Sequence, residues 1–235
     1  MVSNYNSVYP TATASNVDIG LRNYFLGIYK LMTTALATTG IIAWLVSESI
    51  GHVTGPLWWV FSLLPLAFVF ILSAGINRLS ESVAYVLFYE FAASMGLSLS
   101  ALFSVFTGAS IAKALFISAG TFAAFSLYGY TTGKDLSRLG GFLFMGLIGI
   151  IIAGLVNLFF ASTLVSFVIS CITVLVFVGF TAYDTQQLKQ EYLSNGNVYG
   201  FSSQTRSSIY GALQLYLDFI NIFVSLLEIT GIKRD

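Results

Sequence analysis

The chain has 235 residues, of which 57% are hydrophobic and 9% are charged, and its ten basic and ten acidic side chains give a formal net charge of zero. Soluble domains carry about 25% charged residues, so this composition predicts an integral membrane protein. The zero net charge gives no sign of a nucleic-acid partner. The single cysteine, Cys171, lies in an apolar run and predicts neither an intramolecular disulfide nor a metal site.

In chain order, residues 1–22 are expected to form a disordered polar tail, because the first 20 are rich in Ser, Asn, Thr and Tyr and contain no Lys or Arg. Residues 23–231 are expected to form one transmembrane domain, and residues 232–235 a short C-terminal tail. A membrane-crossing helix needs about 20 mostly apolar residues. Seven stretches have nearly that length or more: Tyr24–Val46, Leu57–Ala74, Val83–Phe106, Ile111–Tyr130, Leu139–Phe160, Leu164–Tyr183 and Ile209–Ile229.

These runs are long and continuous, so they predict an all-α integral membrane protein with seven transmembrane helices, not a β-barrel. Only the break between the sixth and seventh stretches is long. In the fifth stretch Gly146, Gly149 and Ala153 share one helix face, which predicts close packing against a neighbouring helix.

Basic residues predict the orientation of the helices, because cytoplasmic loops carry an excess of Lys and Arg. Seven basic residues fall on the side of the N-terminus and three on the opposite side, so the N-terminus is expected to be cytoplasmic. Two of the three exceptions lie in the C-terminal tail, which leaves open whether the last segment spans fully or dips in and returns. The first group is Arg22, Lys30, Arg78, Lys134, Arg138, Lys189 and Arg206, and the second is Lys113, Lys233 and Arg234.

Acidic residues within the apolar stretches are the main candidates for function. An ionisable residue at the centre of a membrane helix costs about 2.5–3.5 kcal/mol and usually faces the bundle interior or a water-filled path. Glu90 in the third stretch is therefore expected to face the bundle. The seventh stretch carries a polar stripe, which is either a structural hydrogen-bond seam or part of a pore that Glu90, Gln214, Asn221 and Ser225 would line. The stripe has a three- or four-residue spacing and consists of Gly211, Gln214, Asp218, Asn221, Ser225 and Glu228.

Asp184 follows the sixth stretch, three residues after Thr181, and could be simply an interfacial residue at a helix end. If it meets Asp218, the two carboxylates cannot both ionise easily in a low-dielectric site and tend to share a proton. Carboxylate oxygens are also the ligands that Ca²⁺ prefers. The pair would then bind protons and Ca²⁺ in competition, which suggests a pH-sensitive cation pathway.

Enzymatic activity is not expected. Gly129 and Gly133 resemble part of a phosphate loop, but their spacing is wrong and Asp135 replaces the residue that would hold magnesium. The only histidine, His52, argues against serine–histidine catalysis and histidine metal sites. An intramembrane aspartyl protease is disfavoured because Asp218 lies in "LYLDF" and lacks the Gly-x-Gly-Asp motif.

Several stretches together resemble the Bax inhibitor family of transmembrane BAX inhibitor motif proteins. The most specific are "AYDTQQLK" after the sixth stretch and "ALQLYLDFINIFVSLLEITG" in the last one. "FYEFAASMGLSLS" and "TTGKDLSRLGGFLFMGLIGIIIAGLVNLF" resemble the third span and the fourth-to-fifth connection of that family. "GLRNYFLGIYKLM" is similar to the start of bacterial members. The resemblance covers nearly the whole chain beyond the N-terminal tail.

This resemblance implies a seven-helix bundle with the last helix at its centre and a di-aspartyl sensor made of Asp184 and Asp218. An arginine at the end of the second helix can contact the sixth-helix aspartate in such proteins, and Arg78 is the matching candidate for this latch. Members are associated with pH-dependent Ca²⁺ leak, so the expectation is a cofactor-free Ca²⁺ leak channel in a bacterial inner membrane. The alternative is a membrane-embedded regulator that binds another membrane protein, such as a protease, without transport of its own. The Glu90 position and the short C-terminal tail depart from the family pattern.

Overall fold

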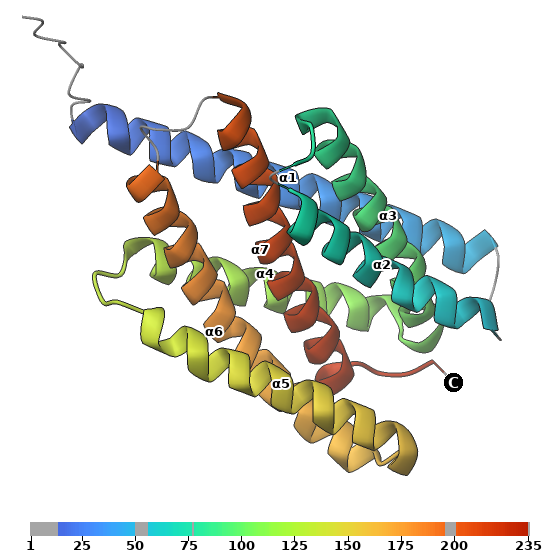
Figure 1. Cartoon of the computed structure of the whole chain (residues 1–235). Helices are drawn as coiled ribbons and strands as arrows, with labels where there is room; N and C mark the ends of the chain where they lie inside the picture. Colours follow the sequence, from blue (N-terminus) through green and yellow to red (C-terminus); the bar gives the residue numbers. More distant parts are fainter. Residues whose placement is uncertain (1–13, 50–55, 77, 196–200, 235) are drawn as a thin grey trace, which may run out of the picture.

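The computed structural model describes residues 14–49, 56–76, 78–195 and 201–234, and within these ranges the chain forms seven α-helices (Figure 1). Six contain a stretch long and apolar enough to cross a membrane, and the described apolar part of the second is shorter, Phe61–Gly75. The expected all-α, seven-helix architecture is therefore confirmed. The helices are α1 (Ala14–Ser49), α2 (Pro56–Gly75), α3 (Glu81–Val105), α4 (Gly108–Thr131), α5 (Ser137–Phe160), α6 (Thr163–Asn195) and α7 (Phe201–Thr230).

Helix α7 lies at the centre of the bundle, as expected, and packs against α1, α2, α3, α4 and α6. In its apolar segment 61% of the residues are buried, compared with 6% in the peripheral helix α5. The buried Tyr216 of α7 contacts both α1 and α3. Its hydroxyl lies 2.7 Å from Thr39 Oγ1 of α1, and its ring packs edge to face against the Phe91 ring of α3. The core of the protein is thus built around the helix that carries Asp218.

Close helix approaches occur where glycine leaves room for a neighbour. A Cβ atom added at Gly129 of α4 would collide with the backbone of Ala182 in α6, and one added at Gly140 of α5 would lie 2.6 Å from the Tyr183 ring. The predicted small-residue face of α5 is only partly right. An added Cβ at Gly146 would lie 3.0 Å from Val176, whereas Gly149 has no neighbour within 4 Å.

Several boundaries differ from those expected from hydropathy. Helix α1 begins at Ala14, so the part of the predicted disordered tail from residue 14 to 22 is helical, while residues 1–13 lie outside the described ranges. Helix α6 continues to Asn195, so much of the predicted long break before α7 is helical as well. The physical reason is that Gln, Lys, Glu and Leu are good helix formers, so a helix can continue after its apolar run has ended.

The path of the last segment, left open by the charges, is decided by the structure. The C-terminal residues reach the connection between α3 and α4, where the Arg234 backbone N–H donates to the Val105 carbonyl at 2.8 Å and that of Ile232 donates to Ser110 Oγ at 2.9 Å. In Figure 1 the start of α1 and the C-terminus lie at opposite ends of the bundle. Helix α7 therefore runs the length of the bundle and does not turn back, while the cytoplasmic placement of the N-terminus stays a prediction.

Candidate functional site

The two aspartates lie on the directly packed helices α6 and α7. Asp218 is buried, with 4% of its surface exposed, and Asp184 is half-buried. They are close enough for the charge of Asp184 to act on Asp218. Asp218 Oδ2 is fully buried and has no hydrogen-bond partner among the described residues. Buried polar atoms nearly always have a hydrogen-bond partner. A buried carboxylate oxygen without a protein partner can therefore bind a proton, a water molecule or a cation.

Asp184 is not at the end of its helix, because α6 continues to Asn195, although Asp184 follows the apolar run Leu164–Tyr183 of that helix. The charge of Asp184 also acts on Tyr210, which lies two helix turns before Asp218 on α7. Asp184 is therefore within electrostatic range of α7 and does not end its helix, while its placement at the membrane interface stays an open alternative.

A buried hydroxyl network lies next to this pair and was not expected from the sequence. Thr185 Oγ1 lies 3.0 Å from Ser126 Oγ, which lies 2.6 Å from the Tyr29 hydroxyl, so the network joins α6, α4 and α1. Thr181 and Thr185 are fully buried, one turn apart on the same face of α6. A signal was available, because Ser118 and Ser126 stand two turns apart in the fourth apolar stretch and are both buried.

The arginine latch expected from the resemblance is not formed. The Arg78 side chain is exposed, and in the part of the chain that the structure describes no ion pair joins it to Asp184. Arg78 lies in the turn after α2, and α2 packs mainly against α3, away from α6. Instead, Arg206 of α7 contacts this turn, with its guanidinium 3.4 Å from the Leu79 carbonyl oxygen.

The expectation that Glu90 faces the bundle is also wrong. Its side chain is exposed, on the face of α3 opposite to Phe88 and Phe91, which are fully buried. Helical spacing explains the error: it fixes which residues share a face, but not which face meets the neighbouring helices. Among the other candidates, Ser225 is buried, and Gln214 and Asn221 are half-buried on α7.

A third carboxylate lies at the far end of the α6–α7 interface. Glu228 accepts a hydrogen bond from the buried Ser170 hydroxyl and lines a cavity of about 440 Å³ together with Asn157 and Ser166. Glu228 lies on the polar stripe of α7, ten residues after Asp218.

Apolar side chains lie beside the stripe between Asp218 and Glu228. Phe177, Val178 and Ile222 form a small buried cluster in the α6–α7 interface. Phe177 stands two turns from both Ser170 and Asp184, and Ile222 follows Asp218 by one turn, so the cluster occupies the level between the two carboxylates. An apolar cluster and the stripe residues Asn221 and Ser225 thus share the level between Asp218 and Glu228.

Known proteins with similar sequences show the family of this chain. The chain matches the family described as "Inhibitor of apoptosis-promoting Bax1" over residues 21–235. It is 44% identical to "Inner membrane protein YbhL" of Escherichia coli (strain K12), over 92% of this chain and 94% of that protein. It is 40% identical to "Uncharacterized protein RP147" of Rickettsia prowazekii over the full length of both chains, and 42% identical to a Deinococcus radiodurans protein over 92% of each. The chain therefore belongs to the Bax inhibitor family and is a multi-pass membrane protein.

Proposed function

We propose that this protein is a cation leak channel that passes Ca²⁺ and whose opening depends on the protonation of Asp184 and Asp218. The observation that carries the proposal is the unsatisfied, fully buried Oδ2 of Asp218, within electrostatic reach of Asp184. A buried carboxylate without a partner is costly in a membrane protein. Such a residue is expected where a proton or a passing cation supplies the missing partner.

The gating step follows from the charge on the pair. With one shared proton, the two carboxylates attract each other through a hydrogen bond and hold α6 against α7. When that proton leaves, two like charges face each other in a dry interface, and either the helices separate or a hard cation binds between them. Protons and Ca²⁺ thus compete for the same oxygens, which makes the leak sensitive to pH.

The apolar cluster of Phe177, Val178 and Ile222 is proposed to be the barrier that the separation removes. Hydrophobic constrictions close channels by excluding water, and a small widening admits it. Movement of α7 relative to α6 would open this level and connect the aspartates to the cavity at Glu228. Such a change needs two packings that differ by only a few kcal/mol.

Ion flux into liposomes that contain the purified protein and a Ca²⁺ indicator, measured across a range of pH, tests the proposal. The wild type is expected to pass Ca²⁺ with a rate that changes with pH. Asp218→Asn keeps the shape but removes the titrating charge, so its flux should be lower and largely independent of pH. Asp184→Asn should also flatten the pH profile, and the two effects should not add, because the residues act as one unit.

The matched control is Glu90→Gln, which removes an exposed carboxylate of α3 and should leave the pH profile unchanged. An Asp184→Asn, Asp218→Asn double variant with a wild-type profile would refute the gating role of the pair. A wild-type protein that passes no cation at any pH would refute the channel itself and favour a regulator that binds another membrane protein.

A further inference from the structure

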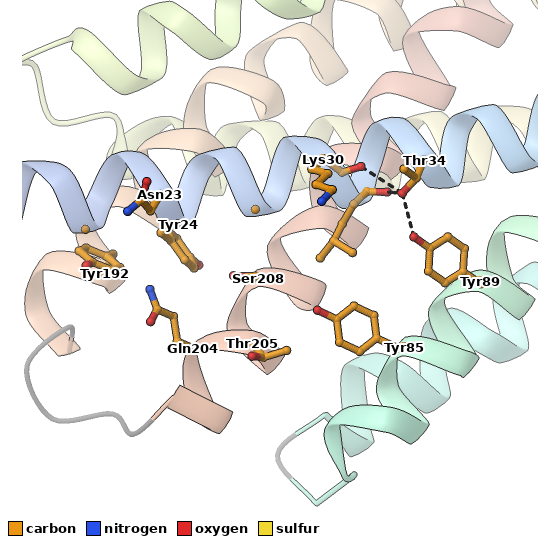
Figure 2. A pocket seen from close by; sticks show the side chains of 13 residues that line it. Asn23, Tyr24, Lys30, Thr34, Tyr85, Tyr89, Tyr192, Gln204, Thr205 and Ser208 are labelled. Carbon is orange, nitrogen blue, oxygen red and sulfur yellow. Dashed lines mark hydrogen bonds between the residues drawn. The ribbon is translucent and has the colours of Figure 1, made fainter.

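A second polar cavity lies at the end of the bundle where α1 begins (Figure 2). It has a volume of about 680 Å³ and is bounded by α1, α3, the last turns of α6 and the first turns of α7. Figure 2 shows Lys30 of α1, Tyr85 of α3 and Gln204 of α7 pointing toward this common space. None of the residues assigned above to the aspartate site lines it, so its contents need a separate explanation.

The walls of this cavity favour a negatively charged ligand. Lys30 is the only charged side chain among its described lining residues, and no carboxylate lines it. Lys30 has no ion pair, and Tyr85 has no hydrogen bond, within the described ranges, so both groups can donate to a ligand. Tyr89 is held in place by a 2.8 Å hydrogen bond between its hydroxyl and Thr34 Oγ1. The ammonium group and the surrounding hydroxyl and amide donors match the acceptor oxygens of a phosphate.

Glu191 is a carboxylate whose charge reaches this wall, since it acts on Tyr24, and Glu81 lies one turn before Tyr85 on α3. Glu191 lies on α6 beside Tyr192, is exposed, and does not line the cavity. Its charge opposes the binding of an anion, so Glu191 and Lys30 should influence a charged ligand in opposite directions. Substitution of these two residues can therefore show whether the bound ligand is negatively or positively charged.

The position of the cavity in the membrane points to a lipid. The cavity lies beside the first turns of α3, where Tyr85 and Tyr89 follow the start of that candidate span at Glu81, which favours a place near the lipid head groups. It follows α1 from Gly20 to Thr34, which corresponds to about 21 Å at a rise of about 1.5 Å per residue. Tyrosine and lysine are favoured at this level of a membrane protein. Next to Tyr85, Val86 exposes 60% of its surface on α3, which offers apolar contact to an acyl chain.

We propose that this cavity binds the phosphate head group of an anionic phospholipid, with Lys30 as the charged contact and Tyr85 as a hydrogen-bond donor. The acyl chains of that lipid lie along the outer surface of α1 and α3. The site is independent of the proposed ion flux, because its test measures binding and not transport.

Native mass spectrometry of the purified protein in detergent provides the test, with phosphatidylglycerol as the ligand and phosphatidylcholine as the uncharged comparison. The wild type is expected to bind phosphatidylglycerol more tightly than phosphatidylcholine. Lys30→Gln should weaken phosphatidylglycerol binding by about tenfold, the effect of losing one charge-assisted contact. The matched control is Lys113→Gln, which removes an exposed lysine of α4 at the other end of the bundle and should have no effect.

Two further measurements determine the sign of the ligand's charge and whether the ligand is a lipid or a free anion. Glu191→Gln should strengthen phosphatidylglycerol binding, whereas a site for a cation would respond in the opposite direction and overturn the proposal. Inorganic phosphate should not displace the lipid at equal concentration, and efficient displacement would show a site for a free anion instead. Equal binding of phosphatidylglycerol by the wild type and Lys30→Gln, with both proteins unfolding at the same temperature, would also overturn it.

Discussion

Replacing Gly129 with alanine should push α4 and α6 apart at the level of the aspartate site. The added Cβ would lie 2.9 Å from the carbonyl carbon of Ala182 and 3.0 Å from its Cα, and would collide with its carbonyl oxygen. All three are backbone atoms, so no side-chain rotation can relieve the contact. Ordinary contacts begin at 3.4 Å, and the carbonyl oxygen is the nearest of the three atoms, so α6 must move by more than the roughly 0.5 Å that the carbonyl carbon alone requires.

The expected loss of stability follows from two opposing effects. Overpacking of a tight interface costs about 1–3 kcal/mol. Exchanging glycine for alanine within a helix stabilises it by about 0.8–1 kcal/mol. Gly120 in the same helix is exposed and has no neighbour within 4 Å, so Gly120→Ala should show the second effect alone. The difference between the two variants therefore isolates the steric cost, which should be about 1–3 kcal/mol against Gly129→Ala.

Thermal unfolding of both variants in the same detergent measures this difference. A chain of this size shifts its Tm by about 2–4 °C per kcal/mol, so Gly129→Ala should unfold roughly 2–12 °C below Gly120→Ala. Because Ala182 precedes Asp184 by two residues, Gly129→Ala should also alter the pH profile of Ca²⁺ flux, while Gly120→Ala should not. Equal unfolding temperatures for the two variants would show that α4 and α6 do not approach each other at Gly129.

Three shorter predictions concern burial and topology. Tyr216→Phe removes a buried hydrogen bond to α1 and should lower the free energy of unfolding by about 1 kcal/mol without changing the helix content measured by circular dichroism. Glu90→Leu should leave the rate and pH dependence of flux unchanged, because this carboxylate is exposed on α3. Loss of the pH dependence in this variant would show that Glu90 takes part in the flux. With Cys171 replaced, single cysteines at Lys134 and Arg234 should react with impermeant reagents from opposite sides of the membrane, the first from the cytoplasm, and labelling of both from one side would contradict the path of α7.

The sequence alone was sufficient for the fold class and for the identity of the central residues. Seven apolar runs predicted seven helices, and the resemblance of the sequence to the Bax inhibitor family implied a central last helix, which α7 is. It also indicated Asp218, which the structure buries. The reason is that lipid cannot hydrogen-bond the backbone, so a long apolar segment in a bilayer must satisfy its own peptide groups as a helix.

Tertiary structure decided which helix faces meet and which side chains come together. Glu90 and Arg78 were both expected near the site, yet both are exposed, whereas Thr185 and Ser126 contact each other unexpectedly between α6 and α4. Hydropathy could not decide this, since lipid tails are as apolar as a leucine-lined helix face and the two surroundings select similar side chains. The choice between them depends on close packing, such as the fit of Gly129 against Ala182, and that complementarity exists only once two distant segments of the chain are side by side.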